Sequence, residues 1–431
     1  MAVMAGILVS SFWPHIPVAL GSSAPPGALW YTVVAGDDIQ KIATKLGLAD
    51  KTLLATWNNI PSPYYVYLNE QLWYLPTNLA YSYYTVVSGD DIQKIATKLG
   101  LADKMWVVYW NNIPSPYYVY LNEALKYIPS GSSGTSRPSG TLVPTTGVLL
   151  GAYDDSGISH FEGQLGRSVV INQHFYSGLQ TVGVDLSNIM SNDFATGHIP
   201  LITWDMPGTT PLLTSIISGS YDTGLKAYAN VFKQQGKHVF LRWGSEMNGN
   251  WIPAIDGSHN GGSSTGPSNF IAAYKHIHDL FIAQGATNVI WVWTPNAGSV
   301  PRDSWNNWKN YYPGDAYVDW VGIDGYNRDP SPWVMTSSIF QSVYNDYKAT
   351  KPIMIAETGT IEAGDGGNLK SAWFVDAATS MQNSMPSIAA YVYFNSNTST
   401  HAWRIDTTST SLTGFKTAFA HNAYYSVTVS P

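Results

Sequence analysis

Residues 238–251 read His-Val-Phe-Leu-Arg-Trp-Gly-Ser-Glu-Met-Asn-Gly-Asn-Trp, an apolar run closed by a glutamate. The run lacks the alternation of a half-exposed strand, so it predicts a strand buried on both faces, as in a parallel sheet. Residues 353–359, Ile-Met-Ile-Ala-Glu-Thr-Gly, repeat the arrangement, and the chain has only six glutamates. Because a carboxyl group at the mouth of a buried strand is costly to desolvate, Glu246 and Glu357 indicate a general acid and a nucleophile acting across one bond.

Apolar runs of this kind alternate with amphipathic stretches from residue 147 onward, which is the rhythm of βα units. A length of about 280 residues with eight such units favours an α/β fold, a (β/α)8 barrel over residues 147–431. The alternative is a doubly wound open sheet. No glycine-rich phosphate loop follows the first strand, whereas polar and aromatic residues follow nearly every strand, as on the catalytic face of a barrel. The eight candidate strands are residues 148–153, 168–175, 199–206, 238–243, 289–294, 318–323, 353–356 and 389–394.

In this count Glu246 follows the fourth strand and Glu357 follows the seventh, so we expect them on opposite sides of one barrel mouth. Such a pair of carboxyl groups is typical of glycoside hydrolysis. A retaining glycosidase needs one protonated and one ionised carboxyl group about 5–5.5 Å apart. Two carboxylates and water suffice for that reaction, so no cofactor is expected. No spacing of His, Asp or Glu predicts a metal site.

Three motifs together carry a family resemblance. They are Arg-Trp-Gly-Ser-Glu-Met-Asn-Gly-Asn-Trp at 242–251, Tyr-Pro-Gly-Asp before Val-Asp-Trp-Val-Gly-Ile-Asp-Gly-Tyr-Asn at 312–327, and Ala-Glu-Thr-Gly at 356–359. This combination resembles glycoside hydrolase family 26 over about 280 residues. The resemblance implies a retaining endo-hydrolase, most often an endo-β-1,4-mannanase, with Glu246 as acid/base and Glu357 as nucleophile.

Further roles follow from the same resemblance. Tyr326 matches the tyrosine that approaches the nucleophile, Trp251 an aromatic residue lining the subsite of the cleaved sugar, and Arg242 the arginine at the base of the same loop. The family usually has His directly before the acid/base, where this chain has Ser245, a shorter side chain that does not titrate near neutrality.

Two electrostatic hypotheses accompany these roles. Arg242 would hold Glu357 ionised, and the apolar residues Trp243, Met247 and Trp251 would raise the pKa of Glu246. Other candidate substrate contacts are Asn248, Trp293, Asn296, Trp204, Asp205, His174 and Trp403. The alternatives are a structural histidine at position 174 and a loop anchor at position 403.

Residues 31–76 and 84–129 align without gaps and differ at nine positions, so they form a duplicated module. Each copy predicts the order strand, helix, helix, strand (βααβ), with the second helix at 53–57 or 106–110. The pattern Tyr-Thr-Val-x-x-Gly-Asp, Ile-Ala-x-x-x-Gly-Leu, Trp-Asn-Asn-Ile and a closing strand before Pro resembles the lysin motif, or LysM.

That family binds N-acetylglucosamine-containing polymers such as chitin and peptidoglycan through two loops. The resemblance assigns glycan binding to Gly36, Asp37, Asp38, Ile39, Asn59, Ile60 and Pro61, and to Gly89, Asp90, Asp91, Ile92, Asn112, Ile113 and Pro114. The usual Pro-Gly-Gln before the last strand is Leu-Asn-Glu here, and the alternative is a pair of packing modules that bind no ligand.

The remaining segments and the composition set outer limits. Residues 1–30 are a possible leader, and residues 130–146, rich in Ser, Gly, Pro and Thr, predict a tether. A net charge of -7 with 12% charged residues excludes a basic nucleic-acid-binding surface, and zero cysteines exclude disulfides. Apart from the possible leader, no segment approaches 18 uninterrupted apolar residues, which disfavours a membrane span.

The combined prediction is a monomeric, secreted or cell-wall-associated endo-β-mannanase that LysM modules hold on chitin or peptidoglycan. One alternative keeps the enzyme but changes the polymer to mixed-linkage β-glucan or β-1,3-xylan, because Ser245 and the Ile-Pro-Ala at 252–254 leave room for a different subsite. The other alternative is a cell-wall protein that holds glycan without cutting it.

Overall fold

The structure, a computed structural model, describes residues 25, 28–48, 50–68, 70–75, 82–99, 101, 103–114, 116–128, 137–178, 184–205, 208–331, 333–420 and 422–431. Most of the predicted leader and the start of the predicted tether, residues 130–136, lie outside this set. The chain divides into two compact units, Met1–Ile128 and Pro129–Pro431. Each is described by itself.

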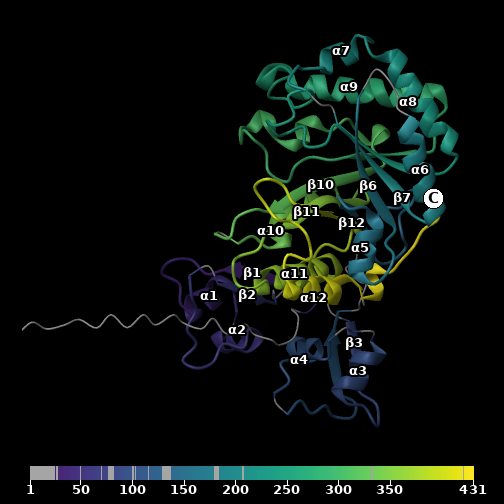
Figure 1. Cartoon of the computed structure of the whole chain (residues 1–431). Coiled ribbons are helices and arrows are strands. Elements are labelled where there is room, and N and C mark those ends of the chain that lie inside the picture. Colours follow the sequence, from purple (N-terminus) through teal and green to yellow (C-terminus); the bar gives the residue numbers. More distant parts are fainter. Residues whose placement is uncertain are drawn as a thin grey trace, which may run out of the picture. The chain divides into compact units, whose positions relative to one another are not determined.

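The second unit is a closed barrel of eight strands in which sequence neighbours pair in parallel all the way round, with helices on the outside (Figure 1). The predicted (β/α)8 barrel is confirmed, and the open sheet is excluded because β12 pairs with β5. The strands are β5 Leu149–Asp154, β6 Ile171–Ser177, β7 Ile199–Asp205, β8 Val239–Trp243, β9 Val289–Trp293, β10 Trp320–Asn327, β11 Ile353–Thr360 and β12 Ile388–Asn395. The helices are α5 Ile158–Leu165, α6 Val184–Thr196, α7 Leu213–Ile217, α8 Asp222–Gln235, α9 Gly262–Gln284, α10 Thr336–Tyr347, α11 Asn368–Asn383 and α12 Ser409–Phe415.

The strands are apolar on both faces because consecutive residues enter two different cores. Leu201 and Phe240 belong to the cluster inside the barrel, while their neighbours Ile202 and Leu241 belong to the cluster under the helices. Double burial of this kind removes most of the strand surface from water, at about 25 cal/mol per Å² of apolar area. It also means that every strand side chain must be assigned to one of two buried faces.

The first unit holds two βααβ modules, as predicted. Capping aspartates start the first helices: Asp38 Oδ1 accepts the Lys41 N–H at 2.8 Å, and Asp91 Oδ1 accepts the Lys94 N–H at 2.8 Å. The second helices begin two residues and one residue before the predicted starts, respectively. The first module is β1 Leu29–Thr32, α1 Ile39–Lys45, α2 Lys51–Trp57 and β2 Gln71–Tyr74, and the second is β3 Ser82–Thr85, α3 Ile92–Lys98, α4 Met105–Asn111 and β4 Ala124–Tyr127.

The sequence differences between the two modules gather where the modules share a core. Residues 52–56, Thr-Leu-Leu-Ala-Thr, are replaced by Met-Trp-Val-Val-Tyr at 105–109. Trp57 and Trp73 lie in one buried cluster with Trp106 and Tyr109, and the Trp73 ring meets the Tyr109 ring edge-on at 5.1 Å between centroids. Aromatic substitutions in one copy therefore cover an aromatic residue of the other.

Candidate active site

Glu246 lies three residues beyond β8 on a strained turn. Its φ is 57°, and Gly244 has a φ of 67° with no room for a side chain, because a Cβ would lie 2.8 Å from Phe270. The backbone N–H of Glu246 donates to Thr294 O at 2.8 Å. A left-handed conformation at a non-glycine residue costs about 1–3 kcal/mol and is concentrated at functional sites, which marks this turn.

Two donors fix the carboxyl group of Glu246. Asn296 Nδ2 donates to Oε1 at 2.7 Å, and Trp251 Nε1 donates to Oε2 at 2.6 Å. Burial raises the pKa of Glu246, and the nearby charge of Glu357 raises it further, while the two donors lower it. The hypothesis that Trp251 raises this pKa is therefore wrong, since its N–H stabilises the ionised form.

Glu357 lies within β11, opposite Asp324 of β10, rather than after the strand as predicted. The strand continues because Thr358 and Thr360 are buried and pair with β10. Arg242 Nη2 donates to Glu357 Oε2 at 2.7 Å, and Tyr326 OH donates to Oε1 at 2.5 Å. Glu357 thus accepts from a guanidinium cation, whereas both donors on Glu246 are uncharged.

Asp324 is a site residue that the sequence reasoning did not select. It is buried and accepts from Arg242 Nη1 at 2.6 Å, so Arg242 bridges two carboxylates. Burial raises the pKa of Tyr326 well above its usual value, which keeps this hydroxyl protonated as a donor. The sequence did contain a signal for this residue, because the motif Ile-Asp-Gly-Tyr places an acidic residue two positions before Tyr326.

Asn248 and Asn296 hold together the loop that carries Glu246. The Asn248 side chain donates to Asn296 O at 2.9 Å and to Ser299 Oγ at 3.0 Å, and it accepts the Asn296 N–H at 2.9 Å. Asn296 in turn reaches Glu246, whereas Asn248 is fully buried. Asn248 thus orients Asn296, the residue that donates to Glu246, and Ser245 beside Glu246 is buried at 5% exposure.

Several predicted substrate contacts are core residues instead. Trp204 and Trp293 are 1% and 0% exposed and belong to the cluster under the helices, because their strand positions point outward from the barrel. His174 Nε2 lies 2.7 Å from Asp193 Oδ2, which fits the structural alternative. Trp403 is 2% exposed and packs on Tyr326, as a loop anchor would. The backbone of Asp205 ends β7, and its side chain is outside the described residues.

A cleft of about 790 Å³ opens beside Glu246, a volume within the usual range for ligand sites. Its lining comes from the loops after β8 and β9, from the end of β10 and the loop after it, and from α10. It includes residues that were not predicted, namely Ala297, Gly298, Val300, Arg302, Gly325, Arg328, Val334, Ser338 and Ile339. Most of these residues lie in loops, which carry no periodic pattern, and this explains why the sequence analysis omitted them.

Aromatic rings gather around Tyr326 at the ends of other strands. Phe394 lies 6.1 Å from Tyr326, and Tyr153 stacks on Phe394 at 5.1 Å between centroids. Phe175 meets Tyr153 edge-on at 4.9 Å and is 37% exposed. These rings form an apolar surface around Tyr326, which donates to Glu357, and a sugar face can contact such a surface.

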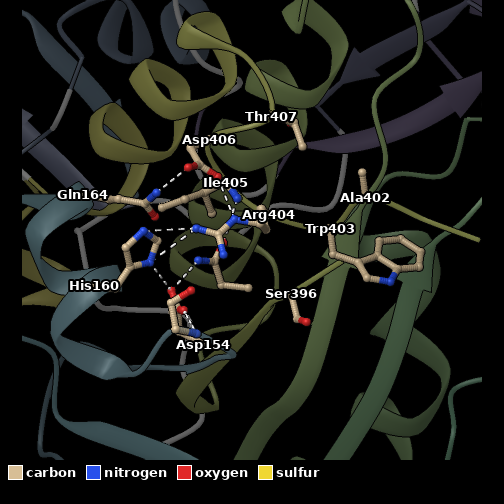
Figure 2. Close-up of polar contacts among 12 residues, drawn as sticks. Asp154, His160, Gln164, Ser396, Ala402, Trp403, Arg404, Ile405, Asp406 and Thr407 are labelled. Carbon is tan, nitrogen blue, oxygen red and sulfur yellow. Dashed lines mark hydrogen bonds and ion pairs between the residues drawn. The ribbon is translucent and has the colours of Figure 1, made fainter. Parts of the chain in front are cut away.

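A polar cluster centred on Arg404 braces the loop after β12 (Figure 2). Arg404 donates to Asp155 at 2.9 Å and to Asp406 at 3.1 Å, and its guanidinium lies 3.2 Å from a His160 ring nitrogen. Figure 2 shows the Trp403 ring turned away from this cluster. That ring packs on Tyr326 at 4.7 Å between centroids. The cluster thereby supports the residue that donates to Glu357.

Many of the predicted LysM contacts are structural. Asp37 accepts from Tyr31 OH at 2.7 Å and from Lys45 at 2.5 Å, and Asp90 makes the same contacts in the second copy. Asp38 and Asp91 are helix caps. The remaining predicted positions divide into buried side chains at Ile39, Ile60, Ile92 and Ile113, left-handed turns at Gly36, Gly89, Asn59 and Asn112, and exposed prolines at Pro61 and Pro114. Unpredicted exposed side chains are Tyr65, Tyr67 and Leu68, with Tyr118, Tyr120 and Leu121 in the second copy.

Comparison with known families agrees with this geometry. Residues 219–400 match the glycosyl hydrolase family 26 model, and residues 31–73 match the LysM domain model. Over residues 219–400 the barrel is therefore similar to glycosyl hydrolase family 26. The resemblance drawn from the motifs is confirmed for the family 26 barrel and for the first LysM module.

The relatives of the family 26 domain differ in their named activities. Endoglucanase H of Acetivibrio thermocellus is 32% identical over 63% of this chain and 30% of its own length. A mannan endo-1,4-beta-mannosidase of Bacillus subtilis is 32% identical over 34% of this chain and 36% of its own length. Beta-1,3-xylanase TXYA of a Vibrio species is 22% identical over 51% of this chain and 46% of its own length. The chain thus spans less than half the length of these curated relatives.

A solved structure gives the same fold at low sequence identity. The Cellulomonas fimi endo-beta-1,4-mannanase double mutant aligns with a TM-score of 0.50 at 15% identity, over 66% of this chain and 72% of that chain. Within the described residues, no helix is long and apolar enough to cross a membrane. No group of three metal-binding side chains occurs in that part of the chain either.

Proposed function

We propose that the family 26 barrel is an endo-acting, retaining β-glycanase with Glu246 as acid/base and Glu357 as nucleophile. The supporting observation is the contrast between the two carboxyl groups. Burial and a neighbouring carboxylate keep the pKa of Glu246 high, whereas Arg242 and Tyr326 both donate to Glu357. One protonated and one ionised carboxyl group are the two states that double displacement needs.

The proposed reaction has two steps. A Glu357 oxygen bonds to the anomeric carbon while Glu246 protonates the departing glycosidic oxygen, which breaks the glycosidic bond and leaves a glycosyl-enzyme. Glu246 then removes a proton from water, which displaces Glu357 and returns the original anomeric configuration. In the first step Glu357 bonds to the sugar and loses its negative charge. In the second step this charge returns, and the hydrogen bonds from Tyr326 and Arg242 stabilise it.

We propose a β-1,4-mannan backbone, including glucomannan and galactomannan, as the first candidate substrate. The mannosidases among the relatives support this choice. Mixed-linkage β-glucan is the second candidate, supported by Endoglucanase H, whose similarity covers more of this chain, and by Ser245 in place of the usual His. β-1,3-Xylan is the third, from the xylanases that also match.

A polymer panel tests these proposals. Reducing ends released from glucomannan, galactomannan, barley β-glucan and β-1,3-xylan are measured for the wild type, with Glu357→Ala as the blank. Hydrolysis of one polymer above the blank identifies the substrate. Equality with the blank on all four would favour the alternative of a glycan-holding protein. Proton NMR of the first product distinguishes retention, seen as the β-anomer, from inversion.

We also propose that the LysM modules hold the enzyme on a polymer containing N-acetylglucosamine, which raises its local concentration there. Deleting residues 1–130 should leave turnover of soluble polymer nearly unchanged, because the barrel has its own core. The deletion should abolish sedimentation with chitin or peptidoglycan, with cellulose as the control solid. Equal sedimentation of both chains would contradict the binding role.

Because its polymeric substrates lie outside cells, we propose a secreted or cell-wall-associated enzyme that acts as a monomer. Fractionation of the producing cells and light scattering of the purified chain test these two points.

A further inference from the structure

The cleft beside Glu246 has an unusual charge content for a site that takes neutral sugars. Its lining contains three ionisable side chains of the Asp, Glu, Lys and Arg types: Glu246, Arg302 and Arg328. Both arginines are exposed, and both come from loops that follow barrel strands, β9 and β10. They therefore face the space into which a bound glycan extends.

Neither arginine forms an ion pair with a carboxylate among the described residues. The acids next to them in sequence are engaged elsewhere: Asp303 accepts from Trp305 Nε1 at 3.2 Å, and Asp329 accepts the Ser331 N–H at 2.9 Å. The guanidinium of Arg328 instead lies over the Tyr326 ring at 4.5 Å and is 5.8 Å from the Trp403 ring. Stacking on rings fixes a guanidinium without neutralising it.

Arg302 is also held at the cleft wall. The loop that carries it is attached to the acid/base loop, since the Val300 N–H donates to Asn248 O at 2.9 Å. Arg328 is tied through Tyr326 to the nucleophile, because Tyr326 donates to Glu357. The two cations thus belong to the scaffold of the reaction centre rather than to a remote surface.

The charge balance of the cleft is positive. Burial favours the uncharged form of Glu246, so the lining holds one carboxyl group against two guanidinium groups. Two guanidinium groups then remain in a chain whose net charge is -7. Unneutralised guanidinium groups form strong, often bidentate, hydrogen bonds to carboxylates.

We propose that the cleft binds a glycan segment carrying a carboxylate substituent, such as a uronic acid side group, with Arg302 and Arg328 as the residues that select it. This inference rests on the proposed function, because the carboxylate is carried by the polymer whose backbone is cut. The enzyme would then prefer an acidic, decorated polymer over the same backbone without charge.

The test compares one neutral polymer with itself. Whichever backbone the polymer panel identifies is carboxymethylated at a low level, and kcat/KM is measured on the charged and the neutral form. We expect the ratio of charged to neutral to be about five- to tenfold in low salt, since an exposed ion pair contributes about 1 kcal/mol. The ratio should fall toward one as salt screens the pair.

Variants assign that preference to the two arginines. Arg302→Gln and Arg328→Gln should each lower the ratio, and Arg302→Lys should restore part of it because the charge returns. Lys226→Gln, which removes an exposed cation from the outer helix α8, is the matched control and should leave the ratio unchanged. A wild-type ratio of one or below, or a ratio that no arginine substitution changes, overturns the inference.

A binding measurement separates failure of this inference from failure of the proposed function. Full-length Glu357→Gln is run in native gels containing the neutral or the carboxymethylated form of each panel polymer. Stronger retardation by a charged form, lost in the Arg302→Gln background, supports the inference even where no hydrolysis is found. Cleavage of a neutral polymer with equal retardation by both forms leaves the proposed function intact and rejects the arginine site.

Discussion

Replacing Trp251 by Phe removes one N–H group from the acid/base while keeping an aromatic ring in the same place. In the wild type this N–H donates to Glu246 Oε2 at 2.6 Å and lowers the pKa of Glu246, against the larger effect of burial. Its loss destabilises the ionised form, so the pKa of Glu246 should rise further. Because a general acid works only while protonated, the alkaline limb of the activity profile should move to higher pH.

The size of the shift follows from the strength of the bond. A hydrogen bond to a charged group contributes about 1.5–3 kcal/mol, and about 1.4 kcal/mol equals one pKa unit. Trp251 is 44% exposed, so water replaces part of the lost interaction. We therefore expect a shift of about half to one pH unit.

The assay is kcat/KM against pH on the soluble polymer that the panel identifies. Trp308→Phe is the matched control, because Trp308 Nε1 also donates to a carboxylate, Asp346 Oδ2 at 2.9 Å, away from the two glutamates. A loss of activity at all pH values that accompanies the shift would reflect a weaker sugar contact. An alkaline limb that stays in place, or moves to lower pH, would refute the assignment of Glu246 as the acid.

Tyr326→Phe removes the hydroxyl that donates to Glu357 at 2.5 Å and should lower kcat/KM by about 10- to 100-fold; near wild-type rates would contradict its role. Asp376 is buried, and burial raises its pKa to about 6. Its contribution to the stability of the folded state is therefore complete below about pH 4, where it is protonated in the folded and the unfolded chain, and is lost as the pH rises through 6. Asp376→Asn should accordingly stabilise the fold by about 2–3 kcal/mol at pH 7.5, with no gain in Tm at pH 3.5. Tyr109→Thr should destabilise the N-terminal unit by about 3 kcal/mol in calorimetry, because Trp73 loses its edge contact, and the exposed Tyr118→Ser is the control that should not.

The barrel was predictable from the sequence because its strands are buried twice. Apolar runs without alternation are the direct result of a core on each side, and eight of them left few other topologies. The same property made individual side chains hard to assign. Trp204 and Trp293 lie one residue away from positions that point into the barrel, and both faces look equally apolar in the sequence.

The carboxyl pair was predictable because a rare, costly residue type recurs at equivalent places. The residues that surround the two glutamates were harder to predict. Arg302 and Arg328 come from loops, where neither periodicity nor propensity indicates direction. The donor role of Trp251 also depends on ring orientation, which composition cannot supply. In the modules, Asp37 resembles a ligand contact in sequence but is occupied by Tyr31 and Lys45.

The shared core of the two βααβ modules affects which strands pair when the chain folds. Duplicated segments in one polypeptide can exchange equivalent strands during folding, which is a characteristic failure of repeat proteins. Lys126 is exposed at the place in β4 that corresponds to Trp73 of β2, which is buried against Tyr109. If β4 took the place of β2, the Lys126 ammonium group would be buried in that aromatic pocket, which is unfavourable. The sequence difference at this position therefore disfavours the exchanged pairing of strands.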